Sequence, residues 1–279
     1  MWVNTLKVQQ LNQSSGSTTN MKIACIQMDI VWENPKENFL RAARLIKSAA
    51  RKGATCICLP ELFETGVTMN SKRFAETLEG ETCAFLSRQA KEHGVYVIGS
   101  FILSNENNMP YNSVVVYDNT GELITNFSKI HVFSYNNEQE GYSSGTAISS
   151  FTMDKFNIVP FICYDLRFPE LFRLAVNKGA NTFVIAANWP NPRKDHWITL
   201  LRARAIENQA YVIGINRVGK SPEHSFFGSS MIISPKGEIV IQGGDKEEVV
   251  IGDISLKEIA EWRQQFPALK DRVNYSQIK

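Results

Sequence analysis

Three residues have the side chains needed for acyl transfer through a thiol, and each follows an apolar, strand-like run. Cys163, Glu61 and Lys129 come at or just after the ends of the runs NIVPFIC, TCICLP and ELITNF. A thiol that attacks an amide carbon needs a proton acceptor and a group that stabilises the oxyanion. A carboxylate can accept the proton and an ammonium can stabilise the oxyanion. The three residues together therefore indicate a nucleophilic cysteine with an acid–base partner.

Cys163 lies where the predicted strand 157–163 gives way to a turn and then to a helix that begins at Pro169. Backbone N–H groups at a helix start favour a thiolate over a thiol. The carboxyl edge of a sheet is also where α/β proteins keep their ligand crevices. We therefore expect an activated thiolate, although a small hydrophobic residue that simply ends a buried strand is the alternative.

Glu61 and Lys129 each have a functional and a structural interpretation. Apolar Leu62 and Phe63 follow Glu61, and partial burial among them would raise its pKa towards that of a general base. An ammonium at Lys129 would favour the thiolate and donate a hydrogen bond to an oxyanion. An exposed turn carboxylate and an ordinary surface lysine are the alternatives.

The elements that would position these residues alternate between β-branched runs and helical spacing, which is typical of an α/β sandwich. Helical spacing is predicted over residues 35–51, 82–93, 169–178 and 194–208. Strands are predicted at 22–28, 55–59, 95–101, 113–118, 122–127, 157–163, 182–187, 211–216, 229–234, 238–242 and 249–254.

Two turns decide the kind of sheet. The segments DNTGE (118–122) and SPKGE (234–238) are hairpin signals between consecutive strands, so the sheets should be mixed and not purely parallel. This excludes a simple dinucleotide-binding fold. Neither a G-x-G-x-x-G nor a G-x-x-x-x-G-K-[ST] motif follows any predicted strand.

Composition limits the partners. The chain of 279 residues is 43% hydrophobic and 21% charged with a net charge of +2, which fits a globular protein without a basic nucleic-acid surface. There is no apolar run long enough to cross a membrane and no signal peptide. Five cysteines fit free thiols in a reducing compartment. We expect a cytoplasmic protein with a disordered leader (1–20) and one domain (21–279).

The three motifs LPELFETG, FSKIHVF and ICYDLRFPE, in this order, resemble those of the nitrilase superfamily of carbon–nitrogen hydrolases. The resemblance runs from Met21 to about Asp253. It implies that Glu61 is the general base, Lys129 the catalytic lysine and Cys163 the nucleophile. The family's second glutamate falls on Glu138, with Glu140 as the alternative.

The resemblance also implies a four-layer α-β-β-α sandwich, commonly dimerised across a helical face, and a reaction without a metal or organic cofactor. The backbone N–H of Tyr164 would share the oxyanion with Lys129, and a thioester would form on the thiol. The four histidines lack metal-ligand spacing, which agrees with the absence of a metal site.

Within the superfamily, CYDLRFPELFR and AANWP look most like the omega-amidase branch, whose members hydrolyse the terminal amide of 2-oxoglutaramate. Such a substrate carries a carboxylate, for which Arg167 is a candidate partner. An internal ion pair of Arg167 with Asp165 or Glu170 is the alternative. Trp189 and Phe133 are candidate walls of the pocket, with plain packing as their alternative.

Rival functions remain at this point. A nitrilase uses the same three residues, but CYDLRFPE looks less like the C-W-E context of true nitrilases. An N-carbamoyl amino-acid hydrolase tends to have two adjacent arginines after the cysteine, and Leu166 occupies the first of these places. A papain-like enzyme would need His131 or His196 as partner. A catalytically silent binding protein on the same scaffold is the alternative from another class.

Overall fold

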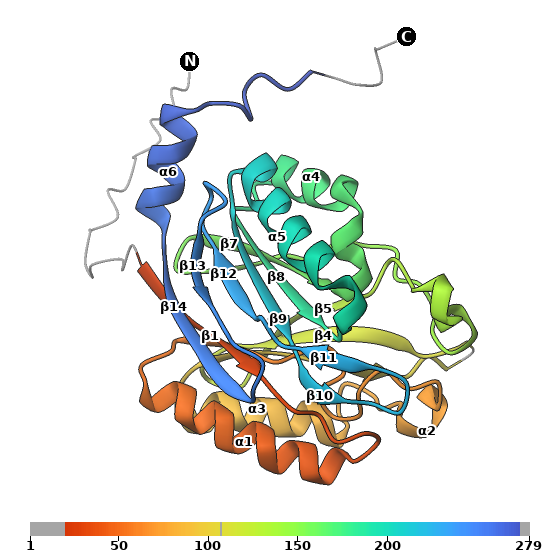
Figure 1. Ribbon diagram of the computed structural model, residues 1–279. Coiled ribbons are helices and arrows are strands. Elements are labelled where there is room, and N and C mark those ends of the chain that lie inside the picture. The colour runs from red at the N-terminus through yellow and green to blue at the C-terminus, as the bar shows by residue number, and fades with distance from the viewer. Residues whose placement is uncertain (1–19, 107, 274–279) are drawn as a thin grey trace, which may run out of the picture.

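In the computed structural model, which describes residues 20–106 and 108–273, two six-stranded sheets lie face to face with helices over their outer faces (Figure 1). Both sheets mix parallel and antiparallel pairs. The predicted α/β sandwich with mixed sheets is therefore confirmed.

The first sheet has parallel pairing only where β2 meets its two neighbours. The hairpin predicted at 118–122 joins its last two strands. In spatial order the strands are β14 (Glu248–Ser255), β1 (Asn20–Gln27), β2 (Cys56–Cys58), β3 (Tyr96–Leu103), β4 (Tyr111–Tyr117) and β5 (Leu123–Ser128).

The second sheet is parallel at its centre, and the hairpin predicted at 234–238 lies at one edge. Its spatial order is β13 (Ile239–Gln242), β12 (Met231–Ile233), β9 (Tyr211–Asn216), β8 (Thr182–Ala187), β7 (Phe156–Ile162) and β6 (Phe151–Met153). A separate two-stranded ribbon consists of β10 (Val218–Lys220) and β11 (Ser225–Phe227).

Two pairs of helices form the outer layers (Figure 1). Helices α1 (Pro35–Arg51) and α3 (Glu81–His93) cover the first sheet, whereas α4 (Pro169–Asn177) and α5 (Lys194–Asn208) cover the second. Helix α1 begins as its sequence predicts, because proline occupies the first turn and the Asn34 side chain accepts a hydrogen bond from the backbone N–H of Glu37 at 3.2 Å. The remaining helical elements are α2 (Ser71–Phe74), α6 (Leu256–Gln265) and the 3₁₀ turns η1 (Ser134–Asn136), η2 (Glu138–Glu140), η3 (Cys163–Arg167) and η4 (Asn191–Arg193).

The main core lies between the two sheets. Phe127 of β5 meets Phe161 of β7 edge-to-face with ring centroids 5.7 Å apart, so these rings join one sheet to the other. Cys25 and Cys83 are buried. This packing fixes the ends of β5 and β7, where Lys129 and Cys163 follow.

Some predicted features differ or lie outside the described residues. The predicted disorder of residues 1–20 concerns a segment that is not described except for Asn20, which pairs with Ser255 at the start of β1. The C-terminal helix α6 buries Ile259 against this chain's own core. None of the helices in the described part of the chain is both long and apolar enough to span a membrane.

A matched pair of glycines tests the packing of α5 on the second sheet. A Cβ at Gly214 would lie 2.6 Å from Leu201 and 2.8 Å from Trp197, whereas a Cβ at Gly244 would meet only Glu248 at 3.5 Å. We expect Gly214→Ala to lower the free energy of unfolding by about 1–3 kcal/mol because the site is overpacked. Gly244→Ala should change it by less than about 0.5 kcal/mol. Urea denaturation followed by circular dichroism measures both; equal effects would contradict the packing described.

Candidate active site

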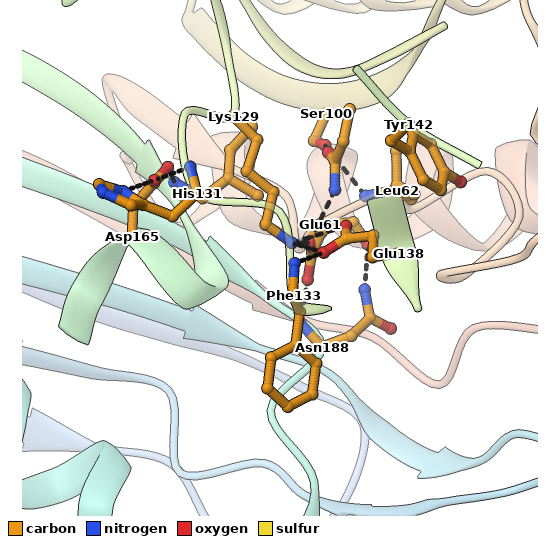
Figure 2. Close-up of polar contacts among 12 residues, drawn as sticks. Glu61, Leu62, Ser100, Lys129, His131, Phe133, Glu138, Tyr142, Asp165 and Asn188 are labelled. Atoms are coloured by element: carbon orange, nitrogen blue, oxygen red, sulfur yellow. Dashed lines mark hydrogen bonds and ion pairs between the residues drawn. The ribbon is translucent and has the colours of Figure 1, made fainter. Parts of the chain in front are cut away.

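The ammonium of Lys129 is buried between two carboxylates (Figure 2). Its Nζ lies 3.0 Å from Glu61 Oε1 and 2.8 and 2.9 Å from the two carboxylate oxygens of Glu138. Burial alone would lower the pKa of Lys129, but the charges of Glu138 and Glu61 raise it well above its usual range. Lys129 is therefore a permanent cation in the resting protein.

Glu61 is held by donors from both sheets, Asn112 in β4 and Asn188 just after β8. Asn112 Nδ2 donates to its Oε1 at 2.8 Å, and the backbone N–H of Asn188 donates to its Oε2 at 2.8 Å. The Asn188 side chain also donates to the Glu61 carbonyl at 2.5 Å. These bonds fix the carboxylate's orientation.

A second layer of hydrogen bonds holds the two asparagines. Ser100 Oγ donates to Asn112 Oδ1 at 3.3 Å and accepts the backbone N–H of Leu62 at 3.0 Å. Arg217 Nη1 donates to Asn188 Oδ1 at 3.4 Å. Sequence patterns missed both asparagines, because an amide at or near a strand end carries no periodic signal.

The choice between the two glutamates of the 138–140 turn is clear in the geometry. Glu138 is buried, binds Lys129 and accepts the backbone N–H of Phe133. Glu140 is exposed, and no hydrogen bond or ion pair of its side chain is found within the described residues. The structure therefore brings Glu138, and not Glu140, together with Glu61 and Lys129.

Cys163 directly follows β7 and begins the turn η3, with its backbone in the left-handed region at φ 42°. This conformation is uncommon for a residue other than glycine and is typical of strained functional turns. Cys163 lines the same cavity as Glu61, Lys129 and Glu138. All four residues predicted to form the catalytic set thus meet at one place.

The sequence predicted a thiolate at Cys163, and this prediction was wrong for the resting site. Burial and then the negative charge of Glu61 raise the pKa of the Cys163 thiol well above its usual value, and Lys129 only partly offsets this. A hydrogen bond with Glu61 also favours the protonated form. The arrangement suits a thiol that gives its proton to Glu61 as it attacks.

Asp165 braces the turn that carries Cys163. Its carboxylate accepts the backbone N–H groups of Ile162 at 3.2 Å and of His131 at 2.9 Å, and it lies 2.9 Å from His131 Nδ1. The ring of His131 stacks on Phe168 with centroids 3.5 Å apart. His131 is thus engaged by Asp165 and Phe168, which removes support for a papain-like pair with Cys163.

A cavity of about 380 Å³ opens onto Cys163. Tyr164, Arg167, Trp189 and Phe133, the predicted substrate-binding residues, all line it. Among the described residues, Arg167 forms no ion pair with Asp165 or Glu170, so that alternative was wrong. Its guanidinium instead lies over the rings of Trp189 and Tyr164, 4.8 and 5.8 Å from their centroids.

The cavity contains two further arginines that sequence patterns did not single out. Arg193 and Arg217 both line it. Arg217 is buried and donates to the carbonyl of Ile30 at 2.7 Å, and burial lowers its pKa to about 10. Within the described residues no cluster of histidine, cysteine or acidic side chains is arranged to hold a metal ion.

Comparison with known proteins identifies the family of this chain. The profile of the carbon-nitrogen hydrolase family matches residues 22–264, nearly the whole chain. The chain is a carbon-nitrogen hydrolase. It belongs to the nitrilase superfamily and its omega-amidase-like branch, and it acts on non-peptide carbon–nitrogen bonds of small-molecule amides.

The relatives cover almost all of this hydrolase. The 2-oxoglutaramate amidase of Bacillus subtilis is 38% identical over 250 residues, which span 89% of this chain and 96% of that protein. Omega-amidase NIT2 of Homo sapiens is 31% identical and covers 91% and 95% of the two chains. The crystal structure of a CN-hydrolase superfamily protein from Xanthomonas campestris, with an arsenic adduct in the active site, is 31% identical with a TM-score of 0.87, covering 91% of this chain and 98% of that one.

Glu64, three residues after Glu61, is a buried carboxyl that the cluster around Lys129 does not include. Its Oε1 accepts the backbone N–H of Ile102 at 3.2 Å, but its Oε2 is buried and has no hydrogen-bond partner among the described residues. Burial raises the pKa of Glu64 to about 8. The folded hydrolase therefore holds a proton on Glu64 at neutral pH.

This proton makes the stability of the hydrolase fall with rising pH. Between the ordinary pKa of an unfolded glutamate and the folded value of about 8, the folded state binds one more proton than the unfolded state. The contribution to unfolding free energy should therefore decrease by about 1.4 kcal/mol per pH unit.

Glu64→Gln, which mimics the protonated group, should remove this slope and be more stable than the parent at pH 8. Denaturation midpoints from pH 5 to 9 for both proteins measure the difference. Parallel pH profiles would contradict a protonated Glu64.

Proposed function

We propose that this hydrolase cleaves the terminal amide of 2-oxoglutaramate to give 2-oxoglutarate and ammonia, through a thioester on Cys163. The observation that carries the proposal is the buried Glu61–Lys129–Glu138 cluster, which faces the thiol in a cavity of small-molecule size. The substrate is suggested by the similarity to the 2-oxoglutaramate amidase of Bacillus subtilis and to omega-amidases.

In the acylation half of the proposed reaction, Cys163 Sγ forms a bond to the amide carbon as its proton moves to Glu61. The electron pair of the C=O π bond moves to oxygen, where Lys129 and the backbone N–H of Tyr164 stabilise the oxyanion. The oxyanion then re-forms the carbonyl, the C–N bond breaks, and the proton on Glu61 passes to the leaving nitrogen as ammonia departs. A thioester and a charged Glu61 carboxylate remain.

In the deacylation half, a water molecule attacks the thioester carbon while Glu61 accepts one of its protons. The second tetrahedral oxyanion is held by the same two donors. Its collapse breaks the C–S bond, and the proton on Glu61 returns to sulfur. The products are a carboxylic acid and the starting thiol, so no metal, cofactor or redox step is needed.

Glu138 has a separate role in this proposal. Both of its oxygens contact Lys129, and its charge is one cause of the raised pKa of Lys129. Glu138 therefore keeps the lysine charged and oriented, while Glu61 accepts the proton of the thiol. Without Glu138, the N–H groups of Lys129 would be directed mainly at Glu61, and Glu61 would be a poorer acceptor for the proton that Cys163 must release.

For the substrate's carboxylate, we propose Arg167 as a partner, with Trp189 and Phe133 as walls of the pocket. Arg167 lines the cavity four residues after the nucleophile and has no carboxylate partner among the described residues. Its position over Trp189 keeps the guanidinium in place before substrate binds.

We further propose that the hydrolase works in the cytoplasm as a homodimer joined through the outer helical face. All five cysteines are free, which suits a reducing compartment. Leu174 of α4 and Ile206 of α5 are 51% and 52% exposed on that face. Sedimentation equilibrium tests the assembly, since a monomer at micromolar concentration would rule out a stable dimer.

Ammonia release from a panel of amides tests the substrate and the nucleophile together. We expect the greatest turnover with 2-oxoglutaramate, less with succinamate, and little with glutamine, an N-carbamoyl amino acid or a simple nitrile. Cys163→Ala should lower kcat by at least about 10³-fold because it removes the nucleophile.

Cys83→Ala is the matched control, since Cys83 is a buried thiol that does not line the cavity, and it should keep most of the activity. A preference for another amide would discard the substrate and keep the thiol chemistry. Full activity in Cys163→Ala would discard the mechanism.

Two glutamates of the same turn test the role of Glu138. Glu138→Gln should lower kcat by about 10- to 1,000-fold with KM changed less than about threefold, because it weakens the positioning of Lys129 and not substrate binding. Glu140→Gln should leave both constants within about twofold. Steady-state kinetics with 2-oxoglutaramate measures both variants. Similar effects from the two substitutions would show that Glu138 has no special role.

A further inference from the structure

Two arginines from different segments lie at the wall of the catalytic cavity. Arg167 belongs to η3 after the nucleophile, and Arg193 belongs to η4 after β8. Both line the same cavity as Cys163. They are close enough that, after burial, the charge of Arg193 is among the causes that lower the pKa of Arg167.

Neither guanidinium has an anionic partner in the part of the chain that the structure describes. Both terminal nitrogens of Arg167 contact His196 Nδ1 at 3.4 Å. Arg193 lies over aromatic rings and joins no ion pair. Glu33 and Glu223 line the cavity too, yet neither lies within ion-pair distance of either arginine. Two neighbouring cations without a counter-ion repel each other, and an anion between them would relieve this repulsion.

Trp189 holds both arginines in place. Its ring carries the guanidinium of Arg167 at 4.8 Å, and its indole N–H donates to the backbone carbonyl of Arg193 at 2.7 Å. Trp189 is itself buried. One buried residue therefore contacts the guanidinium of Arg167 and the backbone of Arg193, which limits the movement of both segments, as a preformed binding site requires.

Arg193 is also linked to the catalytic cluster. Its guanidinium lies 5.3 Å from the ring centroid of Phe133 and 5.9 Å from that of Tyr135. The backbone N–H of Phe133 donates to the Glu138 carboxylate. Phe133 therefore contacts both Arg193 and Glu138. Because Glu138 binds Lys129, the Arg193 guanidinium has a fixed place relative to the reacting groups.

We propose that Arg193 is a specificity-determining residue that shares the substrate's carboxylate with Arg167, so that this hydrolase selects amides whose far end is an anion. The inference rests on the proposed function and deepens it, since it names the second cation that reads the acid end of 2-oxoglutaramate. A carboxylate has two oxygens, so two guanidinium groups can each donate to it. A neutral amide gains nothing from either cation.

Arg193→Gln tests this proposal by comparing charged and neutral amides. KM for 2-oxoglutaramate and succinamate should rise by about 10- to 100-fold, the loss expected for one charge-assisted hydrogen-bonded contact. The kcat values should stay within about threefold, and kcat/KM for neutral butanamide should be unchanged. Arg193→Lys should recover part of the loss because it restores the charge without the planar fork.

Arg88→Gln is the matched control. Arg88 also lies over an aromatic ring, that of Phe85 at 5.9 Å, but it does not line the cavity. This variant should match the parent with every substrate. If Arg193→Gln leaves KM for the charged amides unchanged, or lowers activity on charged and neutral amides alike, the proposal is overturned.

A binding experiment separates failure of this inference from failure of the proposed function. Calorimetry of 2-oxoglutarate and glutarate with Cys163→Ala requires no turnover. Adding Arg193→Gln to that background should weaken binding by about 10- to 100-fold. If the parent hydrolyses no 2-oxoglutaramate but this loss of affinity is observed, the proposed function fails and the anion site stands. If Arg193→Gln leaves the affinity for both ligands unchanged while the parent hydrolyses 2-oxoglutaramate normally, the anion site alone is overturned.

Discussion

The burial of Lys129 between Glu61 and Glu138 is the constraint around which the rest of the site is built. Removing charges from water is costly, and a buried cluster is tolerated only when all of its members are paired and hydrogen-bonded. Here Asn112, Asn188 and the backbone N–H of Phe133 provide these bonds. Removal of Lys129 would leave two buried carboxylates without their counter-ion, at a cost of about 3–5 kcal/mol.

The cluster carries two negative charges and one positive charge, and this excess sets the state of the thiol. A thiolate at Cys163 would add another negative charge beside Glu61, so the resting sulfur keeps its proton. The backbone is strained at both reacting groups, since Leu62, which follows Glu61, and Cys163 both have φ 42°. Ser100 and Asp165 each secure one of these turns by accepting a backbone N–H, from Leu62 and Ile162 respectively.

The sequence alone predicted the features that follow local rules. Helices α1 and α5 have the predicted bounds. Proline marks the start of α1 and its apolar residues lie on one face, whereas in α5 only Trp197, Leu201 and Ala205, four residues apart, mark the buried face. Glu61, Lys129 and Cys163 were found because each follows a recognisable strand and because three motifs occur in order.

The features that sequence analysis missed depend on three-dimensional surroundings. Strands β6, β10 and β11 have three residues each and lack the continuous apolar run that marks the equally short β2 and β12. Asn112 and Asn188 act through partners distant in the chain. The pKa direction of Cys163 was missed for the same reason, since the turn predicts a thiolate and only the folded cluster reveals the opposing charge of Glu61.

The cavity therefore combines two opposite electrostatic demands. Near the sulfur, Glu61 and Glu138 outweigh Lys129, and this region repels an anionic group. At the arginine wall, Arg167 and Arg193 attract one. For the proposed substrate, with a carboxylate at one end and an uncharged amide at the other, this charge distribution favours the orientation with the amide towards Cys163. The same charge distribution that keeps the thiol protonated thus helps to decide which end of the substrate reaches it.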